Sequence, residues 1–152
     1  MDIRSNFNNS LKEALKNKDQ VALSTIRLIT AALKDRDIAA RSKGNNEGIG
    51  ESDILSMLQS MIKQRNDSIK MYRDAGREEL AEQEEAEITV IEKFLPAQLN
   101  DEELSKAIDE AITETGAESV KDMGKVMGIL KSKYAGQIDM GKAGGVVKGK
   151  LG

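Results

Sequence analysis

Apolar residues recur at helical spacing along most of the chain. In the first segment they fall every four residues and share one face of a predicted helix: Ile3, Phe7, Leu11 and Leu15. Asp19 can cap a second helix that runs to about Arg41, and after the turn residues of 44–50 a third helix ends near Gly76. A fourth helix then runs to Pro96. Four helices joined by short connections predict an antiparallel bundle.

The only proline, Pro96, separates this region from a second one. Asn100 and Glu103 have the spacing of a capping box at the start of a fifth helix, and two shorter segments of helical periodicity follow it. Glycine is concentrated in this part of the chain, which suits short helices and tight turns. We therefore predict an all-α protein with two domains, an N-terminal helical bundle at 1–96 and a C-terminal three-helix bundle at 97–152.

Composition removes several kinds of chemistry. The sequence has no His and no Cys, which excludes thiol nucleophiles, zinc fingers, imidazole bases and catalytic triads. The glutamates between residues 78 and 92 lack the histidines of a carboxylate-bridged dimetal bundle, and we interpret them as a solvated helix face. We expect no catalytic residue, no metal site and no cofactor.

The chain also lacks the features of a secreted or membrane protein. Its first residues contain no charged segment followed by an apolar run, and no stretch exceeds three consecutive apolar residues. We expect a cytoplasmic protein without a membrane partner.

Charge is distributed unevenly along the chain. The formal net charge is −3, yet residues 119–152 hold seven Lys against Asp122 and Asp139, a local surplus of five positive charges. Glycines at helix starts expose backbone N–H groups, and nearby lysines can meet phosphate oxygens. If these ammonium groups face outward together, they form a surface for a polyanion. The candidate nucleic-acid-binding residues are Lys125, Lys131, Lys133, Lys142, Lys148 and Lys150.

Two other interpretations apply to this tail. Residues 136–142 and 144–150 match part of a phosphate-binding loop, but Ala143 or Leu151 stands where that loop needs a hydroxyl, and no strand precedes either segment. We therefore reject an NTPase. The second alternative stays open: the lysines solvate the outer face of the helices and bind nothing.

Five segments match a known pattern in order and spacing. They are Arg27 to Lys34, Ile62-Lys63-Gln64-Arg65, Ala75-Gly76-Arg77, Phe94-Leu95-Pro96-Ala97-Gln98-Leu99 and Asp122-Met123-Gly124-Lys125-Val126-Met127-Gly128. Together they make nearly the whole chain resemble the GatB/YqeY family, in particular its small stand-alone YqeY-like members. The resemblance implies an all-α fold of two helical domains.

The resemblance also implies a function for the tail, which is similar to the C-terminal domain of the B subunit of the glutamine-dependent tRNA amidotransferase, a region that contacts tRNA. The matching residues are Gly124-Lys125-Val126-Met127-Gly128, Lys131 and Gly141-Lys142-Ala143. Nothing in the chain corresponds to the catalytic cradle domain of that subunit, and Ala143-Gly144-Gly145 stand where its tail often has Asn-Pro.

We consider three functions. We expect a non-catalytic module that binds tRNA or a tRNA-processing enzyme, and no DNA. The first alternative is an accessory to, or participant in, carbon–nitrogen ligase activity with glutamine as the amide donor, the activity that a family-level label would assign. The second is an adaptor that binds protein without RNA contact, through a groove between the two bundles.

Overall fold

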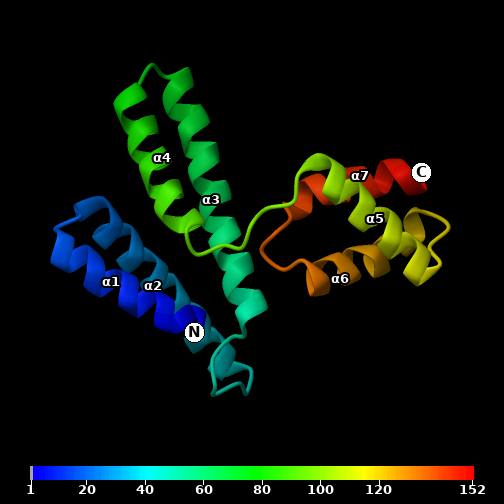
Figure 1. Ribbon diagram of the computed structural model, residues 1–152, viewed down its shortest axis with the longest axis horizontal. Coiled ribbons are helices and arrows are strands. Elements are labelled where there is room, and N and C mark those ends of the chain that lie inside the picture. The colour runs from blue at the N-terminus through cyan, green and yellow to red at the C-terminus, as the bar shows by residue number, and fades with distance from the viewer. Residues whose placement is uncertain (1) are drawn as a thin grey trace. The chain divides into compact units, whose positions relative to one another are not determined.

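Residues 2–152 form seven α-helices and one 3-10 turn, with no strand in that range. The computed structural model that describes them is shown in Figure 1. The prediction of an all-α protein is confirmed. Packing contacts divide the chain between Leu95 and Pro96 into two units. Unit 1 ends at Leu95 and unit 2 is Pro96–Gly152, and each is described by itself.

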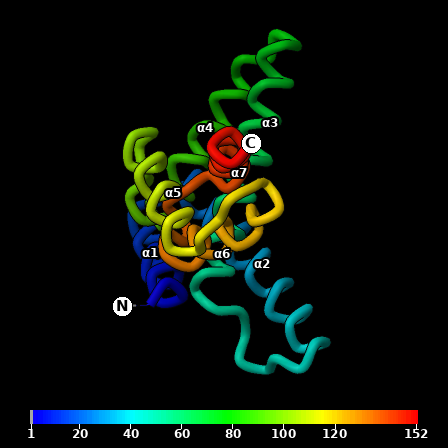
Figure 2. Tube along the Cα trace, turned by 90° about the vertical axis from the view of Figure 1, so that its right-hand side faces the viewer, coloured from blue at the N-terminus to red at the C-terminus, as the bar shows by residue number. Residues whose placement is uncertain are grey.

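Unit 1 consists of two helical hairpins. Its helices are α1 (Ile3–Asn17), α2 (Gln20–Ser42), α3 (Glu51–Asp74) and α4 (Glu78–Glu92). α1 packs on α2, α3 packs along α4, and the two hairpins meet mainly through α2 and α4. Figure 1 shows the paired helices, and Figure 2 shows the loop that leads from α2 into α3 in cyan.

Local signals set the ends of these helices. The Asp2 and Asp19 carboxylates accept hydrogen bonds from N–H groups in the first turns of α1 and α2, because those groups have no partner inside the helix. Gly76 follows α3 with a φ of 74°, the left-handed conformation that favours glycine after a helix. α4 ends at Glu92, short of Pro96, so the proline bounds the helix without forming its last turn.

The core of unit 1 corrects one predicted apolar position. Phe7 is buried and makes an edge-to-face contact with Phe94 at a ring-centroid distance of 4.9 Å. Leu15, which was predicted on the same face as Phe7, is 52% exposed, and Ala14 is buried instead. A spacing of four residues drifts by about 40° per step against a helix of about 3.6 residues per turn. Three such steps carry Leu15 away from the core.

Unit 2 is a small helical unit with its own core. It contains α5 (Asp101–Thr115), the 3-10 turn η1 (Val120–Asp122), α6 (Met123–Lys133) and α7 (Met140–Leu151). The predicted capping box of Asn100 and Glu103 is present at the start of α5, with both hydrogen bonds formed. The Asp139 carboxylate accepts from two N–H groups of the first turn of α7. The buried core residues are Leu104, Ala107, Ile108, Ala111, Val126, Leu130, Ile138, Ala143 and Val147.

Across residues 2–152, no helix has both the length and the apolar character to cross a lipid bilayer.

Candidate functional site

The six candidate lysines lie on two helices of unit 2. α6 carries Lys125, Lys131 and Lys133, and α7 carries Lys142, Lys148 and Lys150; all six are exposed. The inward faces of both helices are filled by the apolar core. The lysines are therefore on the surface of the unit, as the helical spacing of the apolar residues predicts.

Three of these lysines are paired with carboxylates of α5. Lys133 Nζ lies 2.8 Å from Glu114 Oε2, and Lys150 Nζ lies 2.8 Å from Asp109 Oδ1. Lys142 pairs with Asp101. The hydrogen bond from Lys133 to Glu114 raises the pKa of the lysine, because the carboxylate stabilises its charged form.

The other three lysines have no such partner. Over residues 2–152, no salt bridge is formed by Lys125, Lys131 or Lys148. The pKa of Asp122 is lowered mainly by the hydrogen bond that its carboxylate accepts from the Glu118 N–H, and only to a small extent by the charge of Lys125. The positive charge around the lysines of residues 119–152 is thus smaller in the folded protein than the count along the sequence indicates. The reason is that carboxylates of α5, which lie outside this segment, pair with three of the lysines.

The structure also shows an internal repeat that the motif analysis missed. Met123–Lys133 and Met140–Lys150 share the pattern Met-Gly-Lys-x-x-Gly-x-x-Lys-x-Lys. Both helices bury the fourth and eighth positions of this pattern and expose the ninth, which is Lys131 in α6 and Lys148 in α7. At about 100° per residue the ninth position lies about 140° from the fourth, so it points away from the core. Comparing the chain with itself at an offset of 17 residues would have found the repeat.

Three of the four glycines that the two repeats share have open space around them, and the fourth, Gly141, lies close to the Asp139 carboxylate. A Cβ atom added at Gly124, Gly128 or Gly145 would meet no atom within 4 Å. A glycine inside a helix costs about 0.8–1.0 kcal/mol relative to alanine. Packing within the described part of the chain therefore gives no reason for these three glycines.

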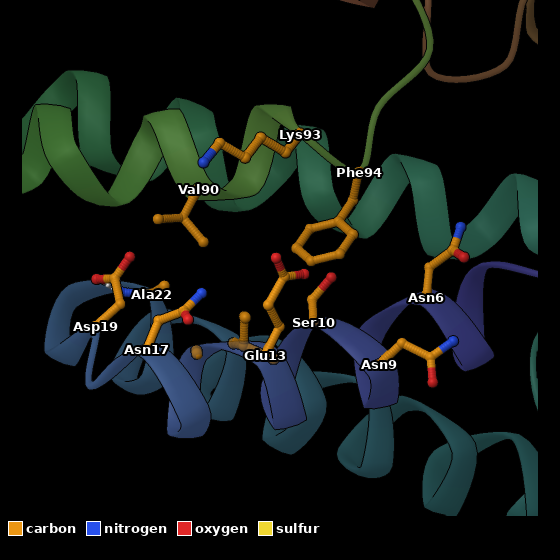
Figure 3. Close-up of a pocket in the computed structure, with 12 residues that line it drawn as sticks. Asn6, Asn9, Ser10, Glu13, Asn17, Asp19, Ala22, Val90, Lys93 and Phe94 are labelled. Atoms are coloured by element: carbon orange, nitrogen blue, oxygen red, sulfur yellow. Dashed lines mark hydrogen bonds between the residues drawn. The ribbon is translucent and has the colours of Figure 1, made fainter.

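A cleft of about 390 Å³ lies within unit 1, between α1, α2 and α4. Figure 3 shows Val90 and Phe94 on one side and the polar side chains of α1 on the other. Apolar side chains line one part of the cleft, and side chains with amide and carboxylate groups line its edge. Its lining residues are Asn6, Asn9, Ser10, Glu13, Ala14, Asn17, Asp19, Ala22, Ile26, Val90, Lys93 and Phe94.

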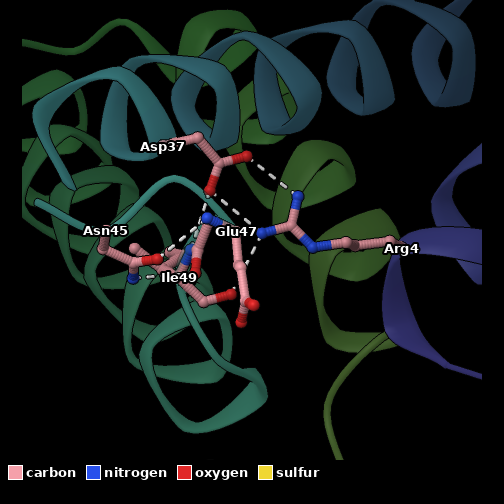
Figure 4. A network of polar contacts seen from close by, with 6 residues as sticks. Arg4, Asp37, Asn45, Glu47 and Ile49 are labelled. Carbon is pink, nitrogen blue, oxygen red and sulfur yellow. Dashed lines mark hydrogen bonds and ion pairs between the residues drawn. The ribbon is translucent and has the colours of Figure 1, made fainter. Parts of the chain in front are cut away.

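A polar network fixes the loop after α2, as Figure 4 shows. Arg4 makes two hydrogen bonds of 2.9 Å to the Asp37 carboxylate and a third, of 3.0 Å, to the Ile49 carbonyl. Asp37 also accepts from the Ile49 N–H at 2.9 Å. The Arg4 hydrogen bond lowers the pKa of Asp37 to about 2. Gly48 has a φ of 92°, which favours glycine, and a Cβ there would lie 2.8 Å from the Arg4 guanidinium and would push it away from Asp37.

The acidic residues of α4 are partly paired with arginines of α3. Arg73 pairs with Glu78 at 3.0 Å and also with Glu85. Arg65 lies 3.8 Å from Glu87, whose pKa is raised by burial. These carboxylates therefore form contacts within the α3–α4 hairpin. The predicted solvated helix face is only partly solvated.

Comparison with known proteins identifies the family. A family model described as "Yqey-like protein" matches residues 4–151. The chain belongs to the YqeY-like family. The family resemblance inferred from the five sequence segments is therefore confirmed.

Three curated relatives of this YqeY-like chain carry the same name, "Altered inheritance of mitochondria protein 41, mitochondrial". The Pyrenophora tritici-repentis protein is 33% identical over 84% of this chain and 68% of its own length. The Candida glabrata protein is 36% identical over 56% of this chain and 45% of its own length. The Saccharomyces cerevisiae protein is 28% identical over 81% of this chain and 67% of its own length. The matches thus span between about half and two thirds of these relatives.

These relatives contradict the prediction of a cytoplasmic location. All three are named as mitochondrial proteins. The prediction rested on a search for a secretory signal and a membrane span, and that search does not distinguish the cytoplasm from the mitochondrion.

Proposed function

We propose that unit 2 of this YqeY-like protein binds the phosphate backbone of tRNA through Lys125, Lys131 and Lys148. The observation that carries the proposal is that these three exposed ammonium groups form no salt bridge within residues 2–152, although Lys125 interacts weakly with the Asp122 carboxylate. Lys131 and Lys148 hold equivalent positions of the internal repeat, on the outward side of two neighbouring helices. The remaining candidates, Lys133, Lys142 and Lys150, lie on the same two helices but are paired with α5.

The physical basis of the binding is the release of counterions. A lysine that neutralises a phosphate releases a condensed cation, so affinity falls as salt concentration rises. The formal net charge of −3 disfavours general attraction to polyanions. We therefore propose that the shape of a folded RNA supplies the selectivity.

We further propose that the protein has no catalytic activity of its own. The sequence offers no imidazole and no thiol, and its resemblance to the amidotransferase subunit is confined to the tail. In this proposal the chain acts as a tRNA-binding accessory module. The alternatives are an accessory that raises carbon–nitrogen ligase activity and an adaptor that binds protein only.

A salt titration of tRNA binding tests the proposal. Total tRNA is titrated with the full chain at several KCl concentrations, and the logarithm of affinity should fall with a slope of about −2 to −3 for three phosphate contacts. The double variant Lys131→Gln and Lys148→Gln should bind more weakly, with a slope that is smaller by roughly 1.4–1.8.

The matched control is Lys12→Gln together with Lys34→Gln. These two exposed lysines of unit 1 give the same change in net charge. Binding that is insensitive to salt, or equal weakening by both double variants, contradicts the proposal. An amide-formation assay on mischarged tRNA, with and without the protein, separates the accessory alternative, since only that alternative predicts a higher rate.

A further inference from the structure

The ion pairs of unit 2 follow a regular geometry. Lys142 with Asp101 and Lys150 with Asp109 are both separated by 41 residues. Equal separations at two points eight residues apart mean that α7 runs beside α5 in the same direction and in a fixed register. Lys133 reaches α5 from the other helix and pairs with Glu114. Carboxylates of α5 thus meet lysines from both neighbouring helices.

These pairs are exposed and therefore weak. The side-chain exposure is 54% for Lys133 and 49% for Glu114, and it is 29% for Lys150 and 62% for Asp109, so the second pair is partly buried on the lysine side. Exposed ion pairs exchange with solvent and salt, and a pair of this kind favours the closed arrangement by about 1.4- to 5-fold. A phosphate that uses one of these lysines must first displace its carboxylate. The pairs therefore reduce the affinity of their lysines for an anion without closing the site.

At the ninth and eleventh positions of the internal repeat, pairing is the same in both helices. At the third position it differs, since Lys142 is paired with Asp101 and Lys125 forms no salt bridge within the described residues. The eleventh position of the repeat is Lys133 in α6 and Lys150 in α7, and both are paired with α5. The ninth position is Lys131 and Lys148, and neither forms a salt bridge within the described residues. The same pattern on two helices thus gives one set of available lysines and one set held by carboxylates.

We propose that the carboxylates of α5 act as an internal competitor for the RNA backbone, so that Lys131 and Lys148 bind phosphate first and Lys133 and Lys150 bind only when Asp109 and Glu114 are displaced. The proposal rests on the proposed function, since it concerns lysines of the same two helices. It divides the lysines of the repeat into a class that is available to phosphate and a class that is paired with carboxylates, a difference that the sequence pattern does not show. In this proposal the α5 carboxylates limit how many lysines contact phosphate groups, because a paired lysine is not available to a phosphate.

The test removes the competing carboxylates. The double variant Asp109→Asn and Glu114→Gln keeps the size of both side chains and leaves the capping box intact. It should raise the affinity for total tRNA by roughly 2- to 25-fold, the product of two exposed ion pairs. Its salt slope should be steeper than that of the wild type by roughly 1.4–1.8, because two further lysines contact phosphates. Asp109→Asn alone should give part of the same effect.

The control is Glu102→Gln together with Glu118→Gln, two exposed carboxylates of unit 2. For these side chains the described structure records no lysine partner. If both double variants raise affinity equally, net charge alone explains the effect and the competitor proposal is overturned. An unchanged affinity of the Asp109→Asn/Glu114→Gln variant overturns the competitor proposal as well. The proposed function still holds in that case if the wild type binds tRNA with the salt slope expected for three phosphate contacts. If neither wild type nor variant binds tRNA in a salt-dependent way, both proposals are wrong.

Discussion

Replacing Asp37 by Asn should destabilise unit 1 in a pH-dependent way. The carboxylate accepts two hydrogen bonds from Arg4 and one from the Ile49 N–H, and its pKa falls from 3.8 to about 2. A shift of this size corresponds to about 2.4 kcal/mol of stabilisation for the ionised form. The Arg4 side chain is 39% exposed, and solvent screening reduces the expected loss to about 1–2 kcal/mol at about pH 7.

The sign of the pH dependence follows from the direction of the shift. The pKa of Asp37 is depressed in the folded protein, so its contribution is complete above the unfolded value and is lost as pH falls through about 4 to about 2. Urea unfolding of wild type and Asp37→Asn, followed by far-UV circular dichroism, should therefore give curves that differ near neutral pH and converge in acid.

Asp35→Asn is the matched control, because Asp35 is an exposed carboxylate on the same helix. It should have little effect on unfolding at any pH. A difference between Asp37→Asn and wild type that is as large in acid as at neutral pH refutes the reasoning. An equal loss of stability in Asp35→Asn also refutes the reasoning, because Asp35 makes no contact with Arg4 that the substitution could remove.

Four further substitutions test the fold by chemical unfolding. Gly48→Ala should cost more than about 1 kcal/mol, because φ is positive and a Cβ would push the Arg4 guanidinium away from Asp37. Gly128→Ala should instead stabilise by about 0.5–1 kcal/mol, since its helical site is open, and any loss contradicts this. Phe7→Ala should cost about 3–5 kcal/mol as a buried aromatic. Asn100→Ala removes one half of the capping box and should cost about 0.5–2 kcal/mol; an unchanged unfolding midpoint would show that this cap is dispensable.

The helices of this protein could be predicted from sequence because their signals are local. Asp19, Asn100 and Asp139 each precede a helix and accept hydrogen bonds from its first turn, as the capping rules predict. The apolar spacing placed most core residues correctly. It failed at Leu15, where a four-residue repeat drifts off the helical face.

The candidate site was only partly predictable. The sequence located the lysines on exposed positions of two short helices, and the family followed from motifs spread over the whole chain. Charge counting within residues 119–152 nevertheless overstated the positive surface. The cleft of unit 1 was also not anticipated, since its residues come from three helices.

The sequence alone therefore determined the helices, several of their caps and the family, because each depends on residues within a few positions of one another or on motifs in fixed order. It did not determine the start of α3, which was expected at Ser52 or Asp53 and has Gly50 as its N-cap without a side-chain hydrogen bond. Only the tertiary structure decided which lysines are available to a ligand. Lys150 and Asp109 are 41 residues apart, and their contact depends on the register in which α7 packs beside α5. That register is set by the burial of the apolar core, whose contacts join residues distant in sequence.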